Sequence, residues 1–183
     1  MRLRHLRIRV MTDKGMFGTD IPFEDGLLIL RAENSMGKST CLKAILVALG
    51  MEAVLTATRT DLPLPPVLKE YVPAADGDAH VIESEIFLEI ENRHRERIVV
   101  HRTVKGNRDS GLIAVTHGPA LSEPEQYRSD EYFVGRSGDT IRALGFLRFL
   151  IEFLEWDIPT VRTFQGDERP LYPQCILPYF FVE

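Results

Sequence analysis

The stretch AENSMGKS, residues 32–39, lies between two segments with different structural preferences. The continuous apolar run Leu27–Leu30 before it predicts a strand buried on both faces, in the middle of an α/β sheet. The almost wholly apolar segment Ser39–Leu49 after it predicts a buried helix, with Gly50 as its C-terminal cap. The sequence therefore predicts a strand, a loop and a helix in succession.

The same stretch matches the Walker A pattern, except that Ala32 stands at the first glycine. In such a loop, backbone N–H groups and the positive end of the following helix surround the β-phosphate of a nucleotide. Lys38 would reach the β- and γ-phosphates as the catalytic cation, and the Ser39 hydroxyl would bind Mg²⁺. We therefore predict ATP and Mg²⁺ as ligands, with Glu33, Asn34, Ser35, Met36, Gly37, Lys38, Ser39 and Thr40 as binding residues.

Gly37 has a specific role in this prediction, because backbone and phosphate nearly touch at that position. Ser35 could add a hydroxyl to the phosphate-binding loop. The alternative interpretation is a capped helix whose lysine lies on the surface. The strand predicted before the loop and the helix predicted after it favour the phosphate-binding interpretation.

Length and composition set further bounds. The 183 residues are 44% hydrophobic, which fits one globular domain with a core. No apolar run reaches the roughly 18 residues of a membrane span, and no signal core follows the N-terminus, so we expect a cytoplasmic protein without a membrane partner. The net charge of −5 argues against coating nucleic acid by bulk electrostatics. Cys41 and Cys175 are expected to be core thiols.

The N-terminal strand predicted for Arg2–Val10 has a local basic strip, formed by Arg2, Arg4, Arg7 and Arg9. These charges either solvate the outer face of an exposed strand or contact DNA or phosphate. The first interpretation is favoured. A turn region at 11–19 and a short strand at 21–23 are expected to follow.

The remainder of the chain predicts an antiparallel layer and one further helix. Prolines in 61–73 exclude a long helix there, and 81–104 predicts a hairpin with Ile82, Ile86, Leu88 and Ile90 on one face. The expected order after the hairpin is a third strand at 112–116, a loop at 123–139, a helix at 140–156 capped by Asp139, a loop after Pro159, and an apolar strand at 175–182.

From Met1 to Gly50, the order of these elements and the motif Asn34-Ser35-Met36-Gly37-Lys38-Ser39-Thr40 resemble the start of SMC, RecN and RecF type ATPases. Within that group, 31–40 and the closing 171–183 resemble a bacterial set of large, SMC-like ATP-binding proteins. The resemblance implies an α/β P-loop NTPase fold, of the ABC-ATPase head type, with a central sheet and an antiparallel β layer. Residues 1–183 would be a single N-terminal half-head.

The resemblance also implies partners. The head would be assembled from both ends of a long chain, so its own C-terminal half and an ATP-dependent head dimer are expected, with DNA as a further partner. The implied function is ATP hydrolysis that drives a DNA clamp in repair, chromosome handling or phage defence. Lys14 falls near the position where relatives place a basic residue close to the nucleotide, and Arg59 could face DNA. A solvated turn or loop charge is the favoured interpretation of both.

Several motifs of that family are not identifiable. The sequence contains no signature of Leu-Ser-Gly-Gly type, and Asp130-Glu131 follows polar residues rather than the apolar strand of a Walker B motif. Gln165 precedes Gly166-Asp167 as a Q-loop glutamine would, but it does not follow an apolar strand. The fragment alone is therefore expected to be an incomplete ATPase.

Two other functions remain open. A small-molecule P-loop kinase would use Lys38 in phosphoryl transfer to a metabolite, but the antiparallel strands predicted at 81–104 argue against the further βα units of such kinases. A binding-only module would hold the nucleotide as a structural ligand.

Overall fold

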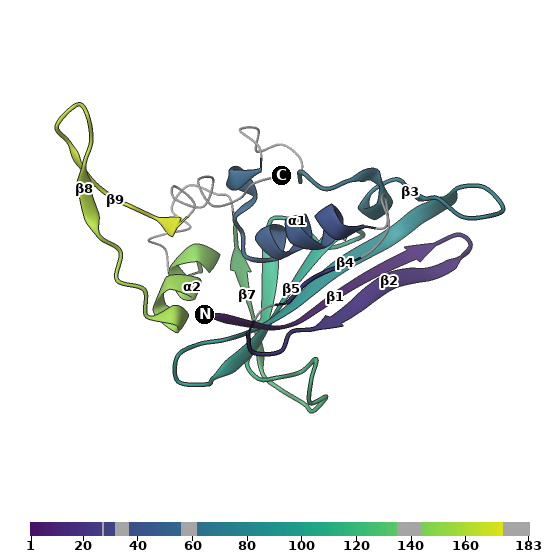
Figure 1. Ribbon diagram of the computed structural model, residues 1–183, viewed down its shortest axis with the longest axis horizontal. Helices are drawn as coiled ribbons and strands as arrows, with labels where there is room; N and C mark the ends of the chain where they lie inside the picture. Colours follow the sequence, from purple (N-terminus) through teal and green to yellow (C-terminus); the bar gives the residue numbers. More distant parts are fainter. Residues whose placement is uncertain (27, 32–36, 56–61, 135–143, 174–183) are drawn as a thin grey trace.

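The computed structural model describes residues 1–26, 28–31, 37–55, 62–134 and 144–173, and its frame is a seven-stranded antiparallel sheet (Figure 1). The strand order is β2-β1-β4-β5-β6-β7, and the short β3 also pairs with β4. The strands are β1 (Arg2–Thr12), β2 (Gly15–Pro22), β3 (Tyr71–Val72), β4 (Ala79–Glu91), β5 (Arg97–Lys105), β6 (Leu112–Thr116) and β7 (Ser129–Phe133). The predicted mixed α/β class and the antiparallel layer are confirmed.

Helix α1 (Lys38–Ala48) lies across one face of this sheet (Figure 1). Alternate residues of the strands supply the apolar surface beneath it, because successive side chains of a strand point to opposite faces. The core of the sheet contains Leu6, Ile8, Val10, Ile86, Leu88, Ile90, Ile98, Val100, Ile113 and Val115. From α1, Cys41, Ala44, Leu46, Val47 and Ala48 are buried, as expected for this apolar helix.

The β1–β2 hairpin is tighter than predicted. The turn region expected at 11–19 is wrong, because β1 continues to Thr12 and β2 begins at Gly15. The Thr12 hydroxyl explains the short turn: it donates to the Gly15 carbonyl at 2.9 Å and accepts the Lys14 N–H at 3.1 Å. The strand predicted at 21–23 is the end of this longer β2.

The predicted β4–β5 hairpin is confirmed, but its facing residues are only partly as expected. Ile86, Leu88 and Ile90 are buried, whereas Ile82 is 56% exposed. Register shifts at Ser84/Glu85 and at Met11/Thr12 explain this error, because a bulge moves the residues beyond it to the other face. Val81 and Ser84 are buried instead.

Strand β6 was predicted, whereas β7 lies inside the expected loop at 123–139, so that loop prediction is wrong for 129–133. Its first three residues, 129–131, are polar, which is compatible with a strand at the edge of the sheet. Helix α2 (Phe146–Leu154) follows, and Tyr132 of β7 stacks on Phe149 with ring centroids 4.5 Å apart. Asp139, the cap expected for this helix, lies outside the described residues.

The described residues 28–30 of the strand expected at Leu27–Leu30 are not part of the sheet. Residues 28–30 form no strand, and Leu28 and Ile29 are 41% and 75% exposed. A buried parallel strand needs parallel neighbours, and each ladder between the described strands is antiparallel. The central sheet of the expected head lobe is therefore not present in the described part of the chain.

Residues between and after these elements form shorter structures. The described residues 62–73 of the proline-rich connection contain no long helix, as expected, but only the short 3-10 turn Pro66–Leu68 and the two-residue strand β3. Another 3-10 turn, Glu52–Val54, follows α1. The loop predicted after Pro159 is instead a small hairpin of β8 (Thr160–Arg162) and β9 (Glu168–Pro170), which extends away from the sheet (Figure 1). Within the described residues, no helix has the length and apolarity needed to span a membrane.

A Schellman motif ends α1 at the predicted glycine. The Gly50 N–H donates to the Val47 carbonyl at 3.1 Å, and the Met51 N–H donates to the Leu46 carbonyl at 2.9 Å. Gly50 has a φ of 66°, and a Cβ there would lie 2.6 Å from Val134 Cγ2. Both its backbone conformation and the space around it therefore require glycine.

Arg102 connects this end of α1 to the sheet. Its side chain is 2% exposed and lies on the α1 face of β5. Nη1 donates to the Val47 carbonyl at 2.7 Å, and Nη1 and Nη2 form a bidentate pair with Glu52 at 2.9 and 2.8 Å. Nε donates to the Ser110 carbonyl at 2.9 Å. A buried guanidinium is stable here because it is paired and hydrogen-bonded on both of its edges.

Replacing Arg102 with Met should lower the free energy of unfolding by about 3 kcal/mol, the scale of a broken buried ion pair. Arg148→Met is the matched control, because Arg148 forms an i,i+4 pair with Glu152 on the surface of α2. Such pairs contribute roughly 0.5 kcal/mol. Urea unfolding measures both variants, and equal losses would contradict the anchoring role of Arg102.

Candidate functional site

The amino end of α1 carries the residues of the predicted phosphate loop that the structure describes. Gly37 is the N-cap residue, in the left-handed region with φ 82° and ψ 11°, and the Cys41 N–H donates to its carbonyl at 3.0 Å. The first N–H groups of a helix have no acceptors within that helix. None of the described side chains caps this end, and the first turn has no acidic residue. Its positive potential is therefore not neutralised by its own first turn.

Gly37, Lys38, Ser39 and Thr40 are brought together at this helix end. Ser39 is exposed, whereas Lys38 and Thr40 are half-buried. A Cβ on Gly37 would meet no atom of the described residues within 4 Å, so they leave the space beside this backbone open. The arrangement thus offers backbone donors, a hydroxyl and an ammonium to an anion. The other predicted binding residues, Glu33, Asn34, Ser35 and Met36, lie outside the described residues.

Lys14 has other partners in the described structure. Its ammonium donates to the carbonyls of Asp76 and Gly77, each at 3.1 Å, and lies 3.4 Å from the Asp76 carboxylate. These contacts hold the β1–β2 turn against the loop before β4. They agree with the favoured interpretation of a turn lysine, while contact with a nucleotide stays a prediction.

The other candidates lie apart from α1 or outside the described residues. Gln165 is exposed in the turn of the β8–β9 hairpin. Arg59 and Cys175 lie outside the described residues.

The N-terminal arginines are largely paired within the chain. Arg4 donates to both oxygens of Glu91 at 3.0 and 2.9 Å, and Arg7 donates to Asp20 at 2.8 Å. Arg2 lies 3.4 Å from Asp25. The Arg9 guanidinium lies over the Phe87 ring, 5.5 Å from its centroid. These contacts fit the favoured interpretation, in which the strip solvates the outer face of the sheet.

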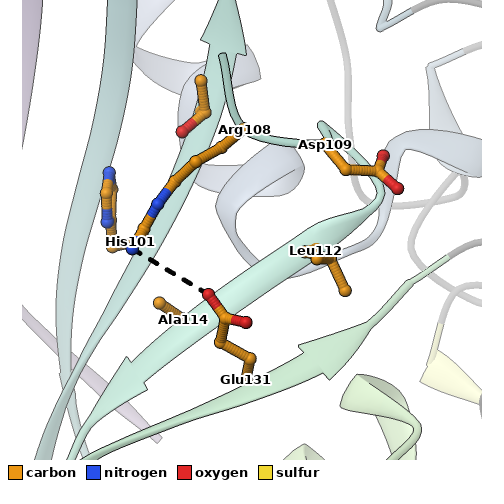
Figure 2. Close-up of a pocket in the computed structure, with 7 residues that line it drawn as sticks. His101, Arg108, Asp109, Leu112, Ala114 and Glu131 are labelled. Carbon is orange, nitrogen blue, oxygen red and sulfur yellow. Dashed lines mark ion pairs between the residues drawn. The ribbon is translucent and has the colours of Figure 1, made fainter. Parts of the chain in front are cut away.

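A cavity of about 160 Å³ lies on the sheet face opposite α1, between His101 and Glu131 (Figure 2). His101 and Arg102 are neighbours on β5, so their side chains point to opposite faces. Burial lowers the pKa of His101, although Glu85 lies 2.8 Å from its Nε2 and opposes that shift. Arg108 and Glu131 form an ion pair of 3.9 Å across the cavity. Its volume is below the usual range of small-molecule sites.

The described residues contain no group of three or more His, Cys, Asp or Glu side chains placed to hold a metal ion.

Comparisons with protein-family models, with curated proteins and with solved structures found no match for this chain.

Sequence reasoning missed Arg102. Its position on β5 was a usable signal, because it alternates with Ile98 and Val100, which predicts the buried face. A buried arginine at that place requires an acceptor on the covering helix, and the structure supplies the Val47 carbonyl.

The ion pairs of Glu91 should make the stability of the fold depend on pH in the acidic range. The hydrogen bond from Arg4, assisted by Arg97, lowers the pKa of Glu91 from 4.5 to about 2. A carboxylate whose pKa is lower in the folded than in the unfolded state stabilises the fold at pH values above its unfolded-state pKa. This contribution is lost as the pH falls from 4.5 towards 2. Glu91→Gln should therefore be less stable than the wild type at neutral pH. The difference in stability between the two proteins should become smaller as the pH falls from 4.5 towards 2.

Thermal unfolding at a series of pH values measures this effect. Glu131→Gln is the control, because that carboxylate is 56% exposed and its ion pair with Arg108 is long, at 3.9 Å. A stability difference between Glu91→Gln and the wild type that is constant with pH would contradict the proposed ion-pair contribution.

Proposed function

We propose that the amino end of α1 binds the phosphates of ATP, with Mg²⁺. The observation that carries the proposal is the start of the helix at Lys38, directly after a left-handed Gly37. A phosphate-binding loop uses this combination, because the glycine lets the backbone approach the anion while the helix end directs N–H groups at it. Lys38 and Ser39 follow at the positions that the motif assigns to the phosphates and the metal.

Each side chain has a distinct proposed role. The Lys38 ammonium would form charge-assisted hydrogen bonds with the β- and γ-phosphates. The Ser39 hydroxyl, exposed at the helix end, would be a magnesium ligand. Since Gly37 lacks a Cβ, the phosphate could lie against its backbone. The bound Mg²⁺ would neutralise negative charge on the phosphate oxygens.

We further propose that this chain is the N-terminal half of an ABC-type head, in an SMC-like ATPase that acts on DNA. Leu28 and Ile29 support this proposal, because these two residues of the apolar run before the loop are exposed where a strand buried on both faces was expected. The partner proposed for this run is the C-terminal half of the head. Two complete heads would then dimerise with ATP between them and drive a clamp in repair, chromosome handling or phage defence.

Two alternatives are kept. A small-molecule kinase is disfavoured by the antiparallel sheet, since compact P-loop kinases continue with parallel βα units. A nucleotide-binding module without catalysis would use the same α1 end, and only turnover separates it from the ATPase.

ATP binding should depend on Lys38. Lys38→Ala removes a charge-assisted contact of about 1.5–3 kcal/mol, so affinity should fall tenfold or more. Lys43→Ala is the matched control, because it removes a lysine from the same helix outside the first turn. Calorimetry with Mg-ATP measures both, and unchanged binding by a folded Lys38→Ala protein would refute the assignment.

The 183-residue chain alone should hydrolyse ATP barely above the uncatalysed rate. Its sequence offers no identifiable residue to orient the attacking water, and positioning with charge stabilisation supplies nearly all of phosphoryl-transfer catalysis. Adding the C-terminal half should raise turnover and promote ATP-dependent dimerisation. Robust turnover by the monomeric chain, abolished by Lys38→Ala, would show that the half-head proposal is wrong.

A further inference from the structure

The β8–β9 hairpin forms an arm that extends from the body of the molecule (Figure 1). Within the part of the chain that the structure describes, its two strands pair only with each other, in the register Thr160↔Pro170, Val161↔Arg169 and Arg162↔Glu168. A turn closes the arm, with the Thr163 N–H donating to the Asp167 carbonyl at 2.7 Å. Residues 160–170 are exposed, apart from the half-buried Thr163. We refer to this segment, 160–170, as the arm.

The arm exposes apolar side chains to water, which is energetically unfavourable. Phe164, in its turn, has a relative exposure of 108%, and Val161 has 37%. A two-stranded hairpin is marginally stable in water, and it needs further strands or a packing surface. A buried phenyl ring contributes 150–250 Å² of contact on average. Among the described residues, the arm therefore has no surface on which to pack.

An apolar groove lies at the base of the arm. It has a volume of about 510 Å³ and is lined from the body by Ile45, Leu49 and Trp156, and from the arm's base by Ile158, Pro159 and Leu171. Two kinds of apolar surface thus occur on one chain: an aromatic tip, and a groove large enough for its ring.

The geometry prevents a chain from filling its own groove with its own tip. About five residues of extended strand separate the base from Phe164, or roughly 17 Å at 3.3–3.4 Å per residue. In a twofold pair of chains with antiparallel arms, however, each tip lies at the base of the other arm. This arrangement is closed and self-complementary, as twofold interfaces require.

We propose that two copies of this chain exchange arms, so that Phe164 of each copy inserts into the groove beside Trp156 of the other. When the two arms pair, their four strands lie side by side, so each hairpin gains neighbouring strands. Charge does not oppose the contact, because the arm carries two arginines, Arg162 and Arg169, and two acidic residues, Asp167 and Glu168. The buried surface is small, so the dimer is weak and depends on concentration.

Sedimentation velocity of the full chain without nucleotide tests the exchange, over about 1 to 200 µM, where weak interfaces of this size associate. The wild type should change from monomer to dimer in this range. Phe164→Ser should remain monomeric, and so should Ile158→Asp, which places a charge in the groove. Tyr71→Ser is the matched control, because it removes an exposed aromatic side chain from β3 and should dimerise as the wild type does.

Mixing the two defective variants provides a second test. Phe164→Ser keeps the groove and Ile158→Asp keeps the tip, so one contact can form between them. An equimolar mixture should associate more than either variant alone and less than the wild type. Trp156, the only tryptophan of the chain, reports this contact, and its emission should shift with concentration in the wild type but not in Phe164→Ser.

Arm exchange is distinct from the proposed ATP-dependent head dimer, because it should persist in Lys38→Ala and without ATP. A dimer that forms only with ATP and is lost in Lys38→Ala would support the head dimer alone and overturn arm exchange. A wild type that remains monomeric at about 200 µM, or a Phe164→Ser protein that dimerises normally, would also overturn it. Since Phe164 is fully exposed, its replacement should leave folding intact, which circular dichroism checks.

Discussion

The buried ion pair of Arg102 with Glu52 fixes the position of α1, and with it the candidate phosphate site. Arg102 extends from the sheet to the Val47 carbonyl in the last turn of the helix, at 2.7 Å. Its positive charge also interacts favourably with the negative, carboxyl end of the helix dipole. At the same end, Gly50 ends the helix with a Schellman motif and leaves room for Val134. A helix held at its carboxyl end and along its apolar face presents Gly37, Lys38 and Ser39 from a fixed place on the sheet, so preorganisation of this site depends on contacts far from any phosphate.

Much of this architecture could be predicted because local rules and packing agree there. Alternation of apolar residues predicts β1, β4, β5 and β6, since one face of each strand covers the core. The helix after the loop was predicted from its apolar composition, and its end from Gly50, because few other residues adopt a positive φ at that place. Of the candidate site, Gly37 to Thr40 lie together at a helix end as expected, and the chemistry proposed for them came from the motif.

The errors have physical causes that sequence patterns do not contain. An apolar run such as Leu28–Leu30 predicts a central strand only if parallel neighbours exist, and the described sheet has none to offer. Bulges reversed the side of Ile82, and β7 escaped prediction because an edge strand need not be apolar. Glu89 is fully buried because the N–H groups of Leu121 and Ser122 and the Ser122 hydroxyl reach it. Such long-range partners become visible only when the chain is folded.

The central claim is that a nucleotide phosphate binds at the amino end of α1. Titration of the ¹⁵N-labelled chain with Mg-ATP, followed by two-dimensional NMR, tests it at the level of single backbone amides. If the claim is correct, the amide signals of Gly37, Lys38, Ser39 and Thr40 shift the most and saturate together, while those around His101 on the opposite face stay unchanged. Saturable shifts confined to another surface, or none at the α1 end at millimolar Mg-ATP, would contradict the claim.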